Sequence, residues 1–418
     1  MALSSASRRP AMLHRLQQRK HKPDYLLVLL STVLLAIGLI VVYAISPGLS
    51  EQQNVSENYY VSKQFTAIGL GIVTFLIAAN LKMHHIKQLK IPLIIAASLV
   101  AVAVHIFGQE VNGATRWVQI GGLSFQAVEL IKFAVLIWLA GFLANRVKEN
   151  NLQSFDKTFK PILIALAGVS IVVAVFQSDL GSVGVLAAMF LAMCFVAGLP
   201  MKRILMVIGI LAIGTVLAIS STGYRRDRFM TFLQPESDCQ SAGYQACQAL
   251  IAIGSGGMFG QNVGGSVQAY GYLPESANDS IFAIFAEMFG FVGSVVLIGL
   301  FVALFARMRH IMERAPDVHS RLLIVGVLAW LSTQALINIG AMLGVLPLKG
   351  ITLPFISYGG TSIIFVTATI GIVFNVSRYT TYGVNNLALS EGKGNESTFD
   401  WRRNRRAHYA PSGRRARA

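Results

Sequence analysis

Charged residues are scarce in this sequence. Asp, Glu, Lys and Arg together make up 13% of the chain, and only 19 of its 418 residues are acidic. Hydrophobic residues make up 54%, and the mean hydropathy is +0.59. A soluble protein of this composition could not cover its surface with polar groups, which excludes an array of soluble domains. The composition instead indicates one membrane-embedded body.

Cysteine is also scarce, and the common metal and nucleotide motifs are missing. No CxxC, HExxH or Cys/His zinc spacing occurs. Of three cysteines, Cys194 lies in an apolar run, whereas Cys239 and Cys247 share one polar loop, where a disulfide is geometrically feasible. The glycine-rich run 254–265 lacks the GK[ST] of a P-loop, so no nucleotide is expected. Its glycines are expected to let the backbone pass close to other elements.

Long apolar runs dominate what is present. About ten of them hold roughly 17 residues or more, the length that a helix rising 1.5 Å per residue needs to cross hydrocarbon. They lack the alternation of a transmembrane barrel. The first run is too long for the core of a cleaved signal peptide, so we expect it to be retained. The runs lie at about 24–46, 63–80, 91–107, 126–144, 160–176, 182–198, 203–222, 280–305, 321–345 and 352–376.

The placement of Lys and Arg sets the expected orientation. Both tails and alternate loops are rich in these residues, whereas the intervening short loops hold only Lys63, Arg116 and Lys349. Because cytoplasmic loops carry the excess of positive charge, both termini are expected in the cytoplasm. The formal net charge of +16 is then mainly a topology signal, and no nucleic-acid partner is expected. The C-terminal arginine cluster belongs either to a solvated tail or to one that lies on anionic membrane lipids.

The expected architecture is therefore an all-α, polytopic membrane protein with about ten transmembrane helices. Its parts are a basic cytoplasmic tail at 1–23, a membrane domain at 24–376 and a basic, disordered cytoplasmic tail at 377–418. A long exterior loop, 223–279, joins the seventh and eighth helices.

That exterior loop breaks the charge rule, because it opens with Arg225, Arg226 and Arg228. Long loops are largely exempt from the rule, so the expected topology stands. The loop ends at Asp279, directly before the eighth helix. Two interpretations stay open on the residues alone: Asp279 satisfies free N–H groups at the helix start, or it has a chemical role at the membrane–water boundary.

Ionisable residues inside the spans need a partner or a function. Glu129 and Lys132 lie three residues apart on one helix face, either as a structural ion pair or as the wall of a polar cavity. Asp179 lies in a short outer turn and either caps the next helix or belongs to a site. Glu287 lies roughly two turns into the eighth helix, where a carboxylate needs donors or a cation to stay charged.

The segment 346–362 contains two prolines and three glycines at the membrane edge. Such a composition indicates broken helix, which is tolerated there only where protein or a polar cavity surrounds it. Irregular backbone at this depth is typical of a substrate path.

Four blocks of the sequence resemble the SEDS family (shape, elongation, division and sporulation), which includes RodA and FtsW. Their order and spacing agree with the family across nearly the whole membrane domain. The version Lys349-Gly350-Ile351-Thr352 is closer to the division branch, FtsW, than to the elongation branch. The blocks are GATRW at 113–117 with FQAVELIK at 125–132, QSDLG at 177–181, YLPESANDSIF with AEMFG at 272–290, and LPLKGITLPFISYGGTS at 346–362.

The resemblance implies a peptidoglycan glycosyltransferase of the bacterial cytoplasmic membrane. Such an enzyme polymerises lipid II, an undecaprenyl-diphosphate-linked disaccharide peptide, on the outer face, at the septum for the division branch. It works with a class B penicillin-binding protein and other division proteins. Asp279 matches the family's essential aspartate and is expected to act as general base or to hold a divalent cation, Mg²⁺ or Mn²⁺.

The remaining candidate residues fall into two groups. Those expected to bind substrate are Arg225, Arg226, Arg228, Arg116, Lys349, Asp179 and Glu287. The three arginines of the exterior loop are the candidates for its diphosphate. Arg116 either lines the path of the donor or forms a structural ion pair with an exterior acid. Those expected to shape the cavity or the fold are Glu129, Lys132, Glu275, Pro354, Ser357, Gly359 and Gly360. The last two glycines are expected to allow close helix approach.

The sequence also departs from the family pattern next to these residues. Ser178 stands where the family has proline, and Ser280 stands where it has phenylalanine; other departures lie at 127–128, 277–278 and 288–289. Two alternatives to the polymerase are a lipid II flippase and a non-catalytic scaffold that activates a transpeptidase. Most of the marked polar residues cluster on the outer side, which favours exterior chemistry over transport.

Overall fold

The computed structural model describes residues 18–20, 22–111, 114–120, 123–220, 223, 226, 230, 232–233, 239–241 and 243–381. The chain divides into two compact units, Met1–Lys20 with Tyr379–Ala418, and His21–Arg378. In the first unit, strands β1 (Gln18–Lys20) and β5 (Tyr379–Thr381) pair antiparallel, with Gln18 opposite Thr381. Most of both expected tails lies outside the described residues.

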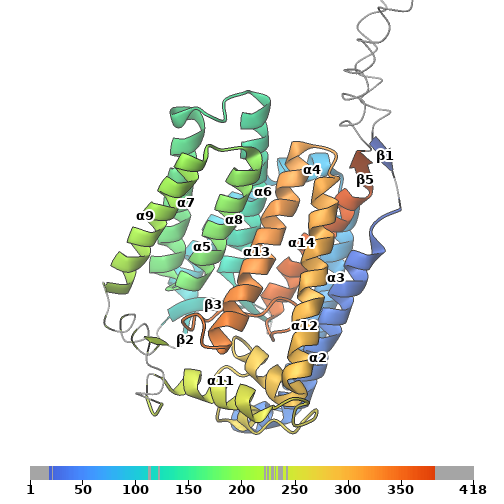
Figure 1. Ribbon diagram of the computed structural model, residues 1–418, viewed down its shortest axis with the longest axis vertical. Helices are drawn as coiled ribbons and strands as arrows, with labels where there is room; N and C mark the ends of the chain where they lie inside the picture. Colours follow the sequence, from blue (N-terminus) through green and yellow to red (C-terminus); the bar gives the residue numbers. More distant parts are fainter. Residues whose placement is uncertain are drawn as a thin grey trace, which may run out of the picture. The chain divides into compact units, whose positions relative to one another are not determined.

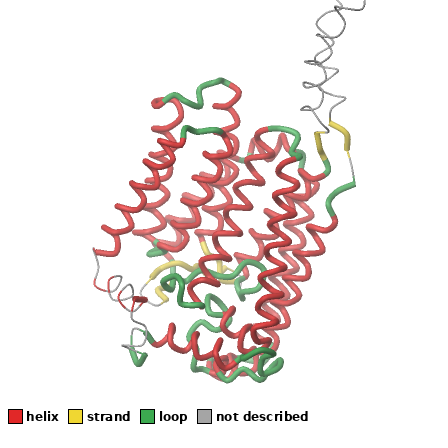
Figure 2. The backbone as a smooth tube through the Cα atoms, in the orientation of Figure 1, coloured by secondary structure: helices red, strands yellow, loops and turns green. Residues whose placement is uncertain are grey.

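The second unit is built almost entirely of helices (Figures 1 and 2). Among the described residues, nine helices are long and apolar enough to cross a membrane, which confirms the all-α membrane class. They are α2 (Tyr25–Gln52), α3 (Tyr59–Asn80), α5 (Lys90–Phe107), α6 (Ala127–Lys148), the continuous stretch Phe155–Phe176, α8 (Leu180–Ala197), α12 (Ile281–Glu313), α13 (Val318–Met342) and α14 (Gly360–Ser377). A further 20-residue helix, α9 (Met201–Ser220), coincides with the expected seventh run.

Several shorter elements complete the unit. The stretch Phe155–Phe176 consists of α7 (Lys160–Ile171) between two π-helical turns, η1 (Phe155–Phe159) and η2 (Val172–Phe176). Two short helices are α4 (Met83–Gln88) and α11 (Tyr244–Ser255), and η4 (Gln268–Tyr270) is a 3₁₀ turn.

A small antiparallel sheet was not expected from the sequence. Its strands are β2 (Gln109–Val111), β3 (Ala114–Ile120) and β4 (Leu123–Gln126), in the order β2-β3-β4. The dipeptides between these strands, Asn112-Gly113 and Gly121-Gly122, are typical of two-residue hairpin turns. These dipeptides are a short signal in the sequence beside the much longer apolar runs.

Small residues bring the helices close together. A Cβ at Gly371 of α14 would lie 2.6 Å from the Phe75 oxygen of α3, and one at Gly38 of α2 would lie 2.6 Å from the Phe355 oxygen. Helix pairs in membranes approach this closely only where side chains are small. Gly38 therefore lets the irregular chain between α13 and α14 pack directly on α2.

Helix α12 is kinked at Gly290, which has φ 66° and ψ −165°. The kink frees backbone N–H groups that would otherwise bond within the helix. Phe291 N donates to the Gly257 oxygen at 2.9 Å, and Val292 N donates to the Met258 oxygen at 3.1 Å. The glycine-rich exterior run thus satisfies the backbone groups of the kink.

The expected role of these exterior glycines is confirmed. A Cβ at Gly256 would lie 2.2 Å from the Ala286 oxygen, and one at Gly260 would lie 2.1 Å from the Met288 oxygen. Any side chain there would collide with the backbone of α12, so glycine is required for the loop to run along the helix.

Candidate functional site

Three segments that are far apart in the sequence meet where α8, α12 and α14 begin. Tyr358 N donates to the Ala277 oxygen at 2.8 Å, which joins the irregular segment 346–359 to the turn 274–280. A Cβ at Gly181 would lie 2.7 Å from Ile351 Cδ1, which places the turn 177–181 against the same segment. This junction lies at the end of the helical body where α11 and the strands β2 and β3 are found (Figure 1).

Asp279 lies in the middle of the junction and is half-buried. Its backbone oxygen accepts a hydrogen bond of 2.7 Å from Asn338 Nδ2, which also donates to the Ile351 oxygen at 2.7 Å. The N-cap of α12 is Ser280, so Asp279 precedes the cap and is not a first-turn acid. Ser280 makes no side-chain capping bond to α12, so both interpretations of Asp279 stay open on this geometry.

Backbone strain marks the same junction. Six described residues other than glycine have positive φ, and three of them are asparagines, which tolerate this region. The other three are Ser178 at 52°, Glu275 at 51° and Phe355 at 67°. One lies in each of the three converging segments. Strained backbone of this kind clusters at functional sites, so the junction stands out on geometry alone.

The Glu129–Lys132 pair reaches the junction through a buried polar chain. Lys132 Nζ lies 2.6 Å from Glu129 Oε1, and the side chains are 2% and 3% exposed. Lys132 also donates to Gln334 Oε1 at 3.1 Å, and Gln334 Nε2 donates to the Thr352 oxygen at 3.0 Å. The pair is thus a structural ion pair that also supports the irregular segment.

Gln334 and Asn338 are site residues that the sequence analysis missed. Both are buried, at 0% and 2% exposure, and their four-residue spacing puts them on one face of α13. Each carries an amide donor to a backbone oxygen of the irregular segment. The signal in the sequence is two amides one turn apart in an apolar run, which is weaker than that of an ionisable residue.

Asp179 caps its own helix, as one interpretation of the sequence held. Its carboxylate accepts from Ser182 N at 3.0 Å and from Ser182 Oγ at 2.7 Å, and it is buried. The capped turn still adjoins the junction, because a Cβ at Gly181 would lie 3.1 Å from Lys349 Cβ. Lys349 itself is half-buried.

Glu287 is occupied by groups of the chain itself. It is 1% exposed, and its carboxylate accepts from Ser266 Oγ, from Val267 N at 3.1 Å and from Gln268 N at 3.4 Å. These are the donors that a buried carboxylate needs. The side chain expected to contact substrate therefore fastens the exterior loop to α12.

Glu275 and Ser357 shape the turn before Asp279. Glu275 Oε2 accepts from Asn278 Nδ2 at 2.6 Å. Ser357 Oγ accepts from Leu353 N at 2.7 Å and donates to the Asn278 oxygen at 2.6 Å. Both side chains thus act on the backbone around Asp279.

The expectation for Gly359, one of the two glycines at the start of α14, needs a correction. Gly359 is the N-cap of α14, and Gly360 is its first residue. A Cβ at Gly359 would meet Ser362 Cβ at 3.7 Å, an ordinary contact, so close helix approach does not require glycine at this position. Pro354 lies in the tight turn that carries the strained Phe355.

The expected cationic residues are described only in part. Arg226 is exposed, whereas Arg225 and Arg228 lie outside the described residues. Arg116 lies on β3, next to Trp117, which pairs with Gln126. The structure does not describe the Arg116 side chain.

Four helix N-termini surround the junction. Gln126 N, at the start of α6, donates to Thr361 Oγ1 in the first turn of α14 at 3.1 Å. The starts of α8 and α12 contact the irregular segment through Gly181 and the turn 274–280. Helix N-termini carry partial positive charge, so their meeting favours an anionic ligand. The carboxylate of Asp179 already occupies the start of α8.

Residues 24–382 match the family of cell cycle proteins FtsW, RodA and SpoVE. The chain belongs to this family. It is 34% identical over 367 residues to stage V sporulation protein E of Bacillus subtilis, covering 87% of this chain and 99% of that protein. It is 35% identical over 359 residues to a probable peptidoglycan glycosyltransferase FtsW of Coxiella burnetii, covering 85% and 96%.

Solved structures of similar proteins have the same fold. A chain of a peptidoglycan synthase complex superposes with a TM-score of 0.71 at 29% identity, covering 85% of this chain and 98% of that one. RodA of Thermus thermophilus superposes with a TM-score of 0.61 at 28% identity, covering 86% and 98%.

The donor set at the junction limits the kind of cation that this family member could hold. Among the described residues, no group of three or more His, Cys, Asp or Glu side chains could bind a metal. Mg²⁺ commonly binds through one or two carboxylates together with substrate phosphates and water. A single carboxylate such as that of Asp279 would be enough for a site of this kind, and the described residues build no all-protein metal site.

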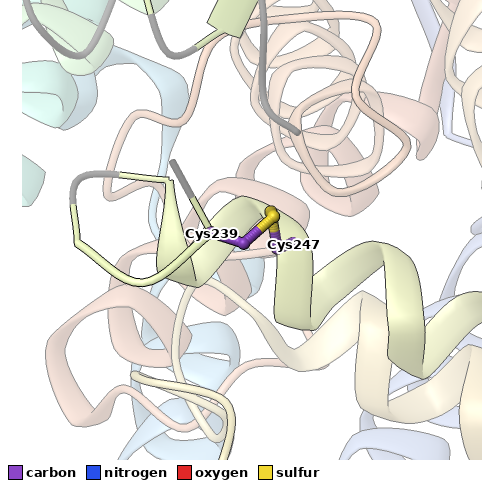
Figure 3. Close-up of a disulfide and its surroundings, with 2 residues drawn as sticks. All are labelled: Cys239 and Cys247. Atoms are coloured by element: carbon purple, nitrogen blue, oxygen red, sulfur yellow. A yellow bond between two sulfur atoms is a disulfide. The ribbon is translucent and has the colours of Figure 1, made fainter. Parts of the chain in front are cut away.

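A disulfide joins Cys239 to Cys247, with the Cα atoms 5.6 Å apart, and ties the chain before α11 to the first turns of that helix (Figure 3). The third cysteine, Cys194, is buried and unpaired.

Proposed function

We propose that this protein is a peptidoglycan glycosyltransferase that polymerises lipid II on the outer face of the cytoplasmic membrane. The observation that carries the proposal is the position of Asp279, outside its helix and at the junction of four helix N-termini. Family members named as probable peptidoglycan glycosyltransferases, at about 35% identity over most of the chain, support the same activity.

Asp279 is the proposed general base. The 4-hydroxyl of the acceptor GlcNAc attacks the anomeric carbon of the donor MurNAc, and the hydroxyl proton passes to Asp279. The new glycosidic bond forms as the bond to the diphosphate oxygen breaks, and undecaprenyl diphosphate leaves with the electron pair. Direct displacement inverts the α-linked diphosphate to a β-1,4 glycan, so no covalent enzyme intermediate is needed.

The leaving diphosphate needs positive charge near Asp279. Helix N-termini supply it at the junction. Lys349 and Arg226 are the described cationic residues proposed to assist, with Arg116, Arg225 and Arg228 as further candidates. A divalent cation held by Asp279 and the diphosphate would neutralise charge as the leaving group departs.

An apolar groove provides a place for the lipid chain. It has a volume of about 680 Å³, and α5, α6, α8 and the stretch Phe155–Phe176 line it. Among the described residues that line it, Ser98 and His105 are the polar ones. One lining residue, Phe176, lies directly before the turn 177–181 at the junction. The undecaprenyl chain of a bound lipid is proposed to lie in this groove.

A class B penicillin-binding protein is the proposed partner, and the division septum is the proposed location. A solved relative belongs to a peptidoglycan synthase complex that coordinates polymerisation and crosslinking. Relatives named FtsW support the division branch. Both termini are proposed to lie in the cytoplasm, since the loops rich in Lys and Arg lie at the end opposite the junction.

The test is lipid II polymerisation by the purified full chain, with and without its cognate transpeptidase. We compare the wild type with Asp279→Asn, and use Asp156→Asn, an exposed acid at the other end of the body, as a matched control. Glycan strands are expected from the wild type and the control, and not from Asp279→Asn. No strands from any folded chain with the partner present would favour a scaffold. Movement of lipid II across vesicles without synthesis would favour a flippase.

A further inference from the structure

The exterior helix α11 is tethered at its start. The disulfide between Cys239 and Cys247 connects the preceding chain to the first turns of the helix (Figure 3). Cys247 is buried at 7% exposure, whereas Cys239 is exposed. The disulfide therefore limits how far the first turn of α11 can move.

That first turn makes a direct contact beside Asp279. Gln245 Nε2 donates to Ser280 Oγ at 3.1 Å, and Ser280 Oγ donates to the Pro274 oxygen at 2.9 Å. Ser280 is fully buried and is the N-cap of α12, yet its hydroxyl makes no capping bond to that helix. Its side chain instead connects α11 to the turn that carries Asp279.

Asp279 is thus held from two sides. Asn338 on α13 holds its backbone oxygen, and Gln245 on α11 holds the neighbouring Ser280. A catalytic carboxylate loses rate when its position is free to vary by about 1 Å. Removing Gln245 would leave the α13 contact in place and release the outer side of the turn.

The far end of α11 is anchored independently of the disulfide. Ser255 Oγ lies 3.5 Å from Glu287 Oε1. Beyond the end of the helix, Gln261 N donates to the backbone oxygen of Glu287 at 2.9 Å. Loss of the disulfide is therefore expected to free the first turn of α11 without releasing the helix. Because the two ends of α11 are held by different contacts, the contact at its first turn can be tested without releasing the whole helix.

The polar contact involves a residue that departs from the family pattern. The SEDS pattern has phenylalanine at the position of Ser280, and a phenyl group cannot accept the hydrogen bond from Gln245. The disulfide between the two cysteines and the hydrogen bond between Gln245 and Ser280 thus both involve the first two turns of α11.

We propose that Gln245, held by the Cys239–Cys247 disulfide, is a positioning residue that fixes Asp279 through Ser280. The activity part of the proposal rests on the glycosyltransferase function proposed above, whereas the positional part does not.

The experiment uses the full chain with its partner and compares Gln245→Ala with the double variant Cys239→Ser/Cys247→Ser. Gln248→Ala is the matched control, because this glutamine lies on the same helix and has none of the described contacts of Gln245. Two quantities are measured: the kcat and KM of lipid II polymerisation, and hydrogen exchange of the backbone amides in residues 274–280. Asn278 N and Ser280 N both donate to the Glu275 oxygen and report on this turn.

The expected result is a fall in kcat of about tenfold for Gln245→Ala and for the cysteine variant, with KM within about twofold. Combining the changes should add no further loss, because they act on one contact. Exchange at 274–280 should become faster in both, and Gln248→Ala should match the wild type. A purely structural role would lower the amount of folded protein without a selective loss of kcat.

If the amides of residues 274–280 exchange at the same rate in Gln245→Ala as in the wild type, the proposal is overturned, whatever the activity of the variant. Unchanged kcat in a folded Gln245→Ala chain would also overturn it. If the cysteine variant does not fold, Gln245→Ala, which keeps the disulfide, still tests the proposal. Absence of strands from the wild type would count against the proposed function alone, since exchange still reports on the contact.

Discussion

Asn338 Nδ2 donates to the backbone oxygens of both Asp279 and Ile351, each at 2.7 Å. One buried amide thus holds together two segments that are separated by more than 70 residues of chain. The residues that follow Ile351 form the strained turn at Phe355. The relative position of Asp279 and the irregular segment therefore depends on α13.

Asn338→Ala is expected to impair activity more than stability. It leaves two buried carbonyl groups without this donor, at a cost of about 1–3 kcal/mol, and lets the Asp279 segment shift, with a loss of roughly 10²-fold in kcat/KM. Polymerisation per folded molecule and the thermal midpoint measure the two effects.

Asn375→Ala is the matched control for this prediction. Asn375 Nδ2 also donates to two backbone oxygens, Ala78 at 2.9 Å and Leu81 at 2.5 Å, far from the junction. The Asn375→Ala variant should lose about as much stability as Asn338→Ala and keep its activity per folded molecule. Equal activity losses in the two variants would contradict a specific role for Asn338.

The buried pair of Glu129 and Lys132 gives the second prediction. Glu129→Gln or Lys132→Met alone should destabilise the protein by about 3–5 kcal/mol, because each leaves an unpaired buried charge. The double variant Glu129→Leu/Lys132→Met should regain most of that stability. Its activity should stay low, since Lys132 no longer holds Gln334 toward Thr352. Recovery of full activity in the double variant would limit the pair to a structural role.

Spans and site differed in how far the sequence could predict them. A membrane-spanning helix is recognised by its length and apolarity, so the apolar runs of the sequence predicted where the helices lie. The last helix is an exception at its start, because it begins at Gly360 and not at 352. The start is late because Pro354 and the strained Phe355 interrupt the chain before it. Whether Ser280 or Asp279 caps α12 could not be decided, because both residue types cap helices well.

The junction itself depends on contacts between distant segments. Asp279 could be selected through the family resemblance, but the roles of Glu287 and Asn338 depend on partners up to tens of residues away. Carboxylates draw attention in an apolar run because their charge is costly there. Amides are less conspicuous, and only the packing of α13 shows that Gln334 and Asn338 face the irregular segment.

Ser178 provides the third prediction, at a position where the family pattern has proline. Its φ of 52° is outside the range of a proline ring, which fixes φ near −65°. Ser178→Pro should therefore destabilise this chain by more than about 1 kcal/mol, although it restores the family residue. Ser178→Gly is the control and should be neutral or stabilising by up to about 1 kcal/mol. A thermal midpoint of Ser178→Pro above that of the wild type would contradict the positive φ of residue 178.

Removal of divalent cations is the fourth prediction. A chelator should stop strand synthesis and leave the thermal midpoint unchanged, because no group of three potential metal ligands occurs among the described residues. The ion would be lost from the substrate complex and not from a structural site. Added Mg²⁺ or Mn²⁺ should restore the rate. Full activity in excess chelator would remove the cation from the mechanism, and leave Asp279 as a base alone.

The apolar groove supplies the last prediction. Gly168 lines it, and a Cβ there would meet nothing within 4 Å, so the larger side chain of Gly168→Phe is expected to extend into the groove. KM for lipid II should rise several-fold, because the long polyprenyl chain loses apolar contact area. A short-chain lipid II analogue that does not reach the groove should keep its KM. Gly214→Phe on α9 is the control, since a Cβ there also meets nothing within 4 Å and Gly214 does not line the groove. Equal KM values for the long-chain substrate in Gly168→Phe and the wild type would show that the chain lies elsewhere.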